Sequence, residues 1–286
     1  MPHLISTITH ALSDVCPAGE ARAIARMVLS EAFGVSELDI YMGKDIHLSE
    51  DEQQKLENII FRLHKNEPIQ YILGYAYCLG MRFRVTPSVL IPRPETAELI
   101  ELVKQRYVDV APRRILDIGT GSGCIAISLA NHWRESEVEA WDVSAEALEV
   151  ACDNSRQAGV QVSFKQCDVL TRTPQTGDEG RFDLIVSNPP YIKEVEREAM
   201  EAHVLDWEPS LALFVPNHDP LLFYRKISVL AISMLADGGM LYFEINREHG
   251  AELVGLLVGL GYKDVELSKD LSGNDRFVSA CKRVTK

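Results

Sequence analysis

A glycine-rich turn between a strand-like run and a helical run constrains the fold of this chain more than any other feature. Residues 114–118 have the short apolar pattern of a buried strand, and residues 124–130 that of the helix after it. Between them, Gly119-Thr-Gly-Ser-Gly123 lets the backbone turn tightly and approach a ligand closely. The dinucleotide fingerprint would require glycine where Cys124 stands. The pattern therefore predicts an open α/β sheet with a ligand site that differs from the dinucleotide motif.

Two further strand ends supply polar candidates for the same site. Asp142 ends the run 138–141, and an acid there can accept hydrogen bonds from ribose hydroxyls, as in nucleotide-binding folds generally. Asp168 and Val169 follow the run 161–166 and could flank an adenine ring, although Asp168 could also cap the next turn. Strand, glycines, helix, strand and acid in this order favour a bound cofactor over a turn without a ligand.

The segment Asn188-Pro-Pro-Tyr191 directly follows the apolar run 182–186, which is typical of a buried strand. Proline has a fixed φ and no N–H, and it restricts the residue before it. Asn188 and Pro189 therefore offer two fixed acceptors, a side-chain oxygen and a backbone carbonyl, suited to gripping an NH2 group on a planar system. The alternative interpretation is a tight surface turn. Because ligands of open α/β sheets bind at the carboxyl ends of the strands, a binding site is the favoured interpretation.

The glycine turn and the Asn-Pro-Pro-Tyr segment together resemble the S-adenosylmethionine-dependent methyltransferases that act on exocyclic or amide nitrogens. Other segments are similar to the release-factor glutamine methyltransferases, the HemK/PrmC type, from about residue 20 to the C-terminus. These segments are residues 68–74, 89–96, 142–148, 208–213 and 273–276.

The resemblance implies an activity, a cofactor and a partner. The family transfers methyl from S-adenosyl-L-methionine, with S-adenosyl-L-homocysteine as product, to the glutamine amide (N5) of the Gly-Gly-Gln loop in class I peptide-chain release factors. We expect Asn188 and Pro189 to accept hydrogen bonds from the substrate amide, and Tyr191 to stack on it. The expected catalytic residues are Asn188, Pro189 and Tyr191, and the expected substrate-binding residues are the same three together with Pro190. The expected cofactor-binding residues are Gly119, Thr120, Gly121, Ser122, Gly123, Asp142, Asp168, Val169 and Asn188.

The chain departs from the family pattern at three places. Ala97 stands where the family usually has an acid, and Asn246 where it has glycine. Residues 215–220 replace a glycine-rich stretch. The two single changes affect local packing, whereas the third changes a loop expected near the substrate.

The expected organisation has three parts. Residues 1–74 have helical periodicity, which predicts a helical bundle with a capping box at Ser49-x-x-Glu52. This bundle stabilises the protein or, as the resemblance implies, docks the substrate, and the two roles are compatible. Residues 75–91 alternate like a β-hairpin linker. Residues 92–286 alternate strand and helix, which predicts a Rossmann-like, mostly parallel sheet. The methyltransferase resemblance implies seven strands, one of them antiparallel.

The composition limits the classes of partner and the location that we expect for the protein. The net charge is −13 and no run of five basic residues occurs, which argues against nucleic-acid binding. The six cysteines have no paired spacing and predict neither a zinc site nor disulfides, so no metal is expected. No apolar run approaches the ~20 residues of a membrane span, and the N-terminus lacks a secretion signal, so we expect a cytoplasmic protein. The rival interpretations are a nucleic-acid amino-methyltransferase (adenine-N6 or guanine-N2) and a non-catalytic S-adenosylmethionine-binding adaptor.

Overall fold

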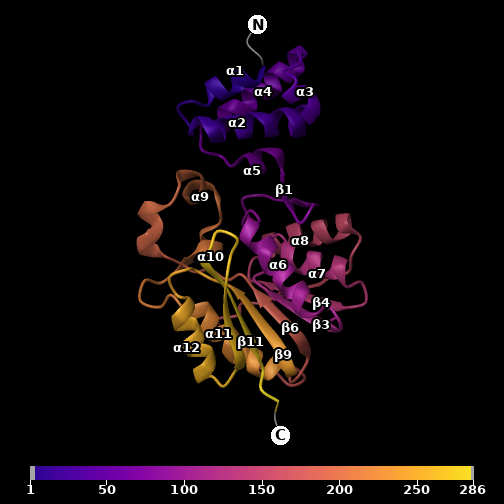
Figure 1. The fold of residues 1–286 in the computed structure, drawn as a ribbon, viewed down its shortest axis with the longest axis vertical. Coiled ribbons are helices and arrows are strands. Elements are labelled where there is room, and N and C mark those ends of the chain that lie inside the picture. Colours follow the sequence, from indigo (N-terminus) through magenta and orange to yellow (C-terminus); the bar gives the residue numbers. More distant parts are fainter. Residues whose placement is uncertain (1–3, 285–286) are drawn as a thin grey trace. The chain divides into compact units, whose positions relative to one another are not determined.

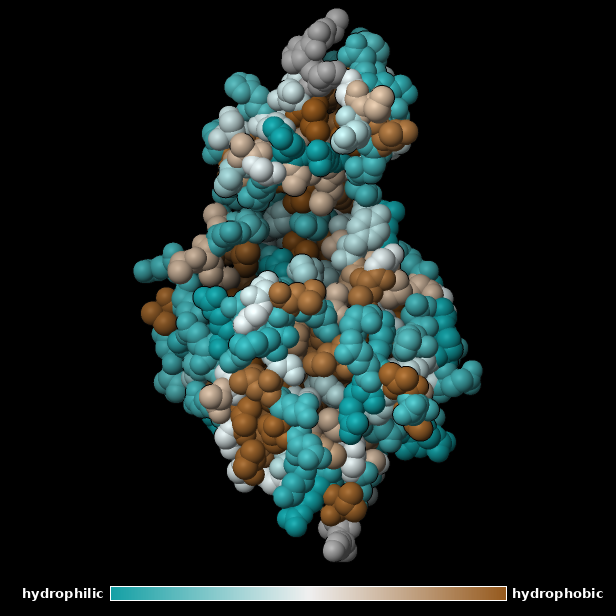
Figure 2. All heavy atoms as spheres, viewed as in Figure 1, coloured by the Kyte–Doolittle hydropathy of each residue, from teal (hydrophilic) through white to brown (hydrophobic). Residues whose placement is uncertain are grey.

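The computed structural model describes residues 4–284 and divides into two compact units. Among these residues, the first unit runs to residue 75 and includes 201–207, and the second comprises 76–200 together with the residues from 208 onward. Within the described residues, no helix combines the length and the apolar character needed to cross a membrane. Hydrophilic residues cover most of the face seen in Figure 2, with smaller hydrophobic areas between them.

The first unit is helical because its apolar residues recur at helical spacing and bury one common core. Ile8, Leu29 and Ile59 are almost fully buried in this core. The predicted capping box is present, since Ser49 N donates to Glu52 Oε2 at 2.8 Å and Glu52 N donates to Ser49 Oγ at 3.3 Å. The helices are α1 (Leu4–Ala11), α2 (Ala18–Met27), the π-helical turn η1 (Val28–Ala32), α3 (Glu37–Tyr41), α4 (Glu50–Leu63), α5 (Ile69–Leu73) and α9 (Ala202–Trp207).

A short hairpin follows the helical segment in sequence. Strands β1 (Tyr75–Cys78) and β2 (Met81–Arg84) are joined by Leu79 and Gly80, which both have positive φ, as a two-residue hairpin turn of type I′ requires. Asn154 fixes the end of β2, because its side chain accepts from Arg84 N and donates to Arg84 O. The predicted linker 75–91 thus contains strands only as far as residue 84.

The second unit is built on a seven-stranded sheet with the order β10-β11-β9-β6-β3-β4-β5. All neighbouring strands pair in parallel except β11, which is antiparallel to both β9 and β10. This topology confirms the predicted mostly parallel sheet with one antiparallel strand. The strands are β3 (Arg114–Ile118), β4 (Glu137–Asp142), β5 (Ser163–Gln166), β6 (Phe182–Ser187), β9 (Leu235–Glu244), β10 (Lys263–Lys269) and β11 (Asp275–Cys281).

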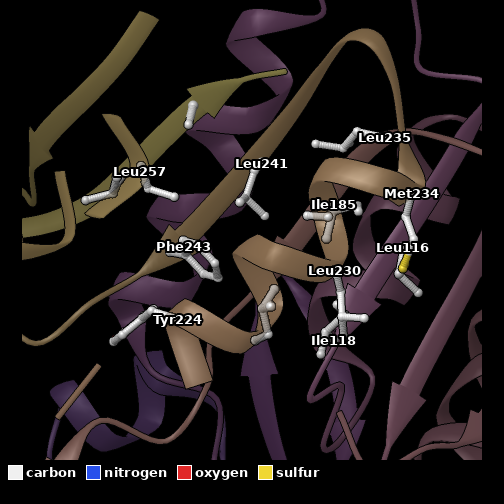
Figure 3. Packing of buried hydrophobic residues seen from close by; sticks show 14 of the residues in the cluster. Leu116, Ile118, Ile185, Tyr224, Leu230, Met234, Leu235, Leu241, Phe243 and Leu257 are labelled. Atoms are coloured by element: carbon white, nitrogen blue, oxygen red, sulfur yellow. The ribbon is translucent and has the colours of Figure 1, made fainter. Parts of the chain in front are cut away.

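Helices cover both faces of this sheet, as Figure 1 shows. Alternate residues of a strand point to opposite faces, so Ile115 packs in a cluster with α6 (Pro94–Arg106) and α7 (Cys124–His132). Leu116 packs in the other cluster, with α11 (Leu222–Met234) and α12 (Gly250–Gly259). In Figure 3, Leu241, Phe243 and Ile185 of the sheet lie against side chains of α11. The remaining elements are α8 (Ala145–Ala158), β7 (Ile192–Lys193), the 3-10 helix η2 (Glu194–Ala199), α10 (Ser210–Leu213) and β8 (Phe214–Val215).

The strand order locates the position where a ligand is expected. The chain runs outward from β3 through β4 to β5, and then returns to place β6 on the other side of β3. A crevice forms at the carboxyl ends of the strands where the order reverses in this way. The glycine turn follows β3 and Asn188 follows β6, so both segments stand at this switch point.

Candidate active site

A cavity of about 430 Å³ opens at the switch point of the sheet in the second unit. This volume is within the range of small-molecule sites in proteins, about 300–1,000 Å³. Of the predicted site residues, those that line the cavity are Gly119, Thr120, Gly121, Ser122, Asp142, Asp168, Val169, Asn188, Pro189 and Pro190. Gly123 and Tyr191 lie outside its lining.

The glycine turn is held in place by backbone hydrogen bonds to the end of β4. Gly119 N and Thr120 N both donate to Trp141 O, at 2.8 and 3.0 Å. Gly119, Gly121 and Gly123 have φ of 75°, 53° and 83°, values that glycine adopts without strain. Gly123 has a packing reason as well, because a Cβ there would lie 2.7 Å from Ile127 Cδ1.

Asp117, which the sequence interpretation did not single out, supports the turn from beneath. Its side chain is fully buried, and its Oδ2 accepts from Thr120 Oγ1 at 2.7 Å and from Ala126 N at 3.2 Å. Burial raises the pKa of Asp117 to about 7, although these two hydrogen bonds act in the opposite direction. Asp117 could have been suspected as an acid within an otherwise apolar strand.

Asp142 contacts both the turn and the start of the next helix. Its Oδ2 accepts from Gly121 N at 2.8 Å, and its Oδ1 accepts from Ser144 N at 3.0 Å. Burial raises the pKa of Asp142 above its ordinary value, while the backbone hydrogen bonds act to lower it. Each carboxylate oxygen has a second lone pair, so the predicted bond to a ribose hydroxyl stays compatible with these contacts.

Asp168 and Val169 line the cavity beside Asp142. Asp168 Oδ1 accepts from Leu170 N at 2.9 Å, so this carboxylate caps the following turn, which was the alternative interpretation. Val169 is buried in the core against α11. Contact of either residue with an adenine ring stays a prediction.

The segment after β6 presents its asparagine and prolines to the cavity. Ser187 Oγ donates to Ile118 O at 2.6 Å and fixes the end of β6 to the end of β3. The side-chain amide of Asn188 donates from Nδ2 to Thr96 Oγ1 at 3.3 Å. Thr96, at the start of α6, was not among the predicted site residues, although it belongs to the segment 89–96 that carries the resemblance.

Tyr191 points into the protein. Its hydroxyl lies 3.5 Å from Glu244 Oε1, and burial raises the pKa of Tyr191 well above its ordinary value. Asn246 Nδ2 donates to the backbone carbonyl of Tyr191 at 3.4 Å, so the asparagine that replaces the family's glycine holds this segment. The predicted stacking of Tyr191 on a substrate amide stays untested.

The segment 88–93 closes one side of the cavity. Arg93 lines the cavity and forms an ion pair with Glu208, whose side chain is fully buried. Glu208 also accepts from Ile91 N at 3.3 Å. Glu95 lies in the first turn of α6, where an acid interacts favourably with the helix dipole.

Residues 215–220 do not line the cavity, and their expected position near the substrate stays a prediction. Their contact with the site is indirect: β8 pairs with β7, immediately after Asn-Pro-Pro-Tyr, and Asn217 Oδ1 accepts from Val195 N at 2.8 Å. The unusual loop therefore supports the segment that carries Asn188. Ala97 packs at the edge of the core between α6 and the sheet.

The fold and the site together define the class of the protein. A seven-stranded sheet with one antiparallel strand, a glycine turn after β3 and an acid at the end of β4 form the framework of S-adenosylmethionine-dependent methyltransferases. The cavity residues fit such a cofactor, because they combine exposed backbone at Gly119 and Gly121, the Asp142 carboxylate and an apolar wall. Among residues 4–284, no cluster of three or more histidines, cysteines or acids could hold a metal ion.

Comparison with known proteins gives the family. Residues 95–205 match the model of the methyltransferase small domain, and residues 3–74 match that of the PrmC N-terminal domain. The release factor glutamine methyltransferase of Bacteroides thetaiotaomicron is 51% identical, over 98% of this chain and 99% of the relative. The corresponding protein of Flavobacterium psychrophilum is 40% identical over 94% of each chain. The chain belongs to the release factor glutamine methyltransferase family.

A solved methyltransferase structure from Pyrococcus furiosus has a TM-score of 0.53 to this chain, at 19% identity. It covers 80% of this chain and 100% of its own. This likeness supports the fold.

Proposed function

We propose that this protein transfers the methyl group of S-adenosyl-L-methionine to the side-chain amide nitrogen of the glutamine in the Gly-Gly-Gln motif of class I peptide-chain release factors. The observation that carries the proposal is that Asn188, Pro189 and the glycine turn line one cavity at the switch point of the sheet. A donor held by the turn would thereby meet an acceptor held by the asparagine and proline.

The cofactor-binding part of the proposal rests on the residues of three strand ends. S-Adenosyl-L-methionine, when bound, supplies an electrophilic methyl group on sulfur, and S-adenosyl-L-homocysteine is the product. Asp142 would accept hydrogen bonds from ribose, and Asp168 and Val169 would border the adenine. The turn from Gly119 to Gly123 would approach the cofactor with its backbone.

The chemical problem is that an amide nitrogen is a weak nucleophile, since its lone pair is delocalised into the carbonyl. Asn188 Oδ1 and the Pro189 carbonyl would accept hydrogen bonds from the two N–H groups of the substrate amide. These acceptors orient the nitrogen and stabilise the positive charge that develops on it during transfer. Pro190 would fix the direction of the Pro189 carbonyl, because the ring of a proline restricts the backbone conformation of the residue before it.

The acidic character of the chain supports a protein substrate over a nucleic acid. The net charge is −13, whereas proteins that bind nucleic acids present clustered cations to phosphate. In the helical unit, Leu38, Tyr41 and Met42 are 69%, 84% and 72% exposed, which is typical of an interaction surface. We assign substrate docking to this helical unit, and cytoplasmic location belongs to the same proposal because release factors act on ribosomes.

The experiment is methyl transfer from labelled S-adenosylmethionine to a purified class I release factor, with DNA and ribosomal RNA as parallel substrates. We expect label only on the release factor, and only on its Gly-Gly-Gln glutamine by mass spectrometry. A release factor in which that glutamine is replaced by asparagine is the matched control and should stay unlabelled. Label on nucleic acid, or on neither class of substrate, would contradict the proposal.

A further inference from the structure

A chain of hydrogen bonds leads from the cavity to a buried carboxylate. Asn188 Nδ2 donates to Thr96 Oγ1 at 3.3 Å, and Thr96 Oγ1 donates to Glu244 Oε2 at 2.7 Å. Glu244 ends β9 and is 1% exposed, and it does not line the cavity. The three side chains come from the end of β6, the start of α6 and the end of β9, so only the folded sheet brings them together.

The direction of these bonds follows from the number of protons available. A threonine hydroxyl has one proton, and here it is donated to Glu244. The Thr96 oxygen therefore offers only lone pairs to Asn188, and only the NH2 half of the asparagine amide can satisfy them. An amide turned by half a rotation would place two oxygens against each other without a proton between them.

Glu244 is suited to act as the acceptor that sets this direction. Its two oxygens face donors on separate segments, Thr96 at 2.7 Å and Tyr191 at 3.5 Å. Burial raises the pKa of Glu244 to about 7; the nearby charge of Glu95 also raises it, whereas Thr96, Arg276 and Tyr191 lower it. An unpaired charged carboxylate would be costly to bury. The hydroxyls of Thr96 and Tyr191 and the nearby guanidinium of Arg276 stabilise the charged form of Glu244.

We propose that Thr96 and Glu244 are positioning residues that fix the side-chain amide of Asn188 with its oxygen directed to the substrate NH2. The inference rests on the proposed function, since it explains how Asn188 presents its side-chain oxygen as an acceptor to the substrate amide. Neither residue takes part in bond making: Thr96 acts on Asn188, and Glu244 acts on Thr96. The pair thereby selects a substrate that donates hydrogen bonds from nitrogen.

The first test compares two substitutions at position 96. Thr96→Val keeps the shape and removes the hydroxyl, and we expect kcat for release-factor methylation to fall about tenfold, the usual worth of one hydrogen bond. The Kd for S-adenosylmethionine, measured by calorimetry, and the KM for the release factor should stay within about twofold of wild type. Thr96→Ser restores the hydroxyl and should restore kcat. Equal kcat for wild type and Thr96→Val would overturn the proposal.

The second test reverses the direction of the hydrogen bonds between Glu244, Thr96 and Asn188. In Glu244→Gln the NH2 group can donate to Thr96, which frees the Thr96 proton to face Asn188 and turns the asparagine amide over. We expect kcat to fall at least as much as in Thr96→Val, while thermal unfolding shows that the variant is folded. An unchanged kcat in folded Glu244→Gln would also overturn the proposal.

Two readouts separate positioning from a general structural effect. Ionisation of Glu244 should make wild-type kcat rise with pH around 7, and this rise should vanish in Thr96→Val, where Glu244 no longer reaches Asn188. The NH2 resonances of Asn188, assigned by their loss in Asn188→Ala, should shift in Thr96→Val and stay in place in Thr96→Ser. If wild-type enzyme methylates no release factor, the proposed function fails, while the NMR comparison still decides the inference.

Discussion

The carboxylate of Glu208 lies 2.5 Å from the guanidinium of Arg93, and the two side chains are 0% and 32% exposed. They join the segment before α6 to the segment before α10, which are more than 100 residues apart in sequence. Because Arg93 lines the cavity, this ion pair connects the stability of the second unit to the shape of the site.

Replacing Arg93 with alanine should destabilise the protein, because a buried carboxylate then loses its charged partner. Breaking a buried pair costs about 3–5 kcal/mol, and we expect the lower end because Arg93 is partly exposed. Chemical denaturation measures the change. Arg225→Ala, which breaks a more exposed pair with Asp219, is the control and should cost about 1 kcal/mol or less. Equal losses in the two variants would contradict the expectation.

Replacing Asn188 with alanine should remove methyl transfer while the cofactor still binds. Loss of one acceptor of transition-state charge costs about 10²–10³ in kcat, by analogy with loss of one oxyanion-hole donor. The Kd for S-adenosylmethionine should change little, since many other residues line the cavity and would still contact the cofactor. Asn131→Ala removes the same side chain from α7, outside the cavity, and should keep most activity. Full activity in the Asn188 variant would contradict the proposal that Asn188 accepts a hydrogen bond from the substrate amide.

Replacing Asp142 with alanine should weaken cofactor binding by about 1.5–3 kcal/mol, the worth of a hydrogen bond to a charged acceptor. The structure adds a second cause, because Asp142 also accepts from Gly121 N and holds the turn. Asp142→Asn keeps one acceptor oxygen and should lose less affinity than the alanine variant. Calorimetry checks both, with the more exposed Asp153→Asn on α8 as control. Unchanged affinity in the alanine variant would exclude a role for this carboxylate.

Replacing Gly123 with alanine should destabilise the glycine turn for two separable reasons. The positive φ costs about 1–2 kcal/mol in an L-residue, and the new Cβ at 2.7 Å from Ile127 Cδ1 adds an overpacking cost of about 1–3 kcal/mol. Adding Ile127→Val removes the clashing methyl and should recover part of the loss. Gly177→Ala, at φ 91° in open space, measures the backbone cost alone by thermal unfolding. The packing argument fails if Gly123→Ala costs no more than Gly177→Ala.

The protein should become less stable relative to an Asp117→Asn variant as pH rises from about 4 to about 7. The folded state keeps the Asp117 proton to about pH 7, whereas the unfolded chain releases it near 3.8. The folded state thus binds more protons in this window, and the contribution to stability falls by up to about 1.4 kcal/mol per pH unit and levels off above pH 7. Asparagine mimics the neutral acid and has no such dependence.

Urea unfolding of both proteins across this pH range measures the difference. Glu244 titrates in the same window but is present in both proteins, so its contribution cancels. The exposed Glu137→Gln removes one charge at the surface and should run parallel to wild type. If the difference in the free energy of unfolding between wild type and Asp117→Asn stays constant across this pH range, Asp117 has no raised pKa.

Local patterns were enough to predict the strands and the turn that carry the site. The apolar run at 114–118, the glycines at 119–123 and the run at 182–186 each lie where the sequence indicated, because buried parallel strands are continuous apolar segments and tight turns need glycine. The capping box at Ser49 and Glu52 is equally local, since both partners lie within one helical turn. The antiparallel β11 was expected from the family resemblance alone, as no local pattern distinguishes its direction.

Only the tertiary structure decided how the site is supported. Thr96, Asn188 and Glu244 are separated by 92 and 56 positions, and no periodicity relates them. The same holds for Arg93 and Glu208, and for Asp117, whose burial beneath the turn gives it a raised pKa. The sequence determined which groups stand at the ends of the strands, because strand and turn preferences are local. Packing of the strands determined which of these groups form hydrogen bonds and which have a shifted pKa. Hydrogen bonds and desolvation depend on distances that only the assembled sheet defines.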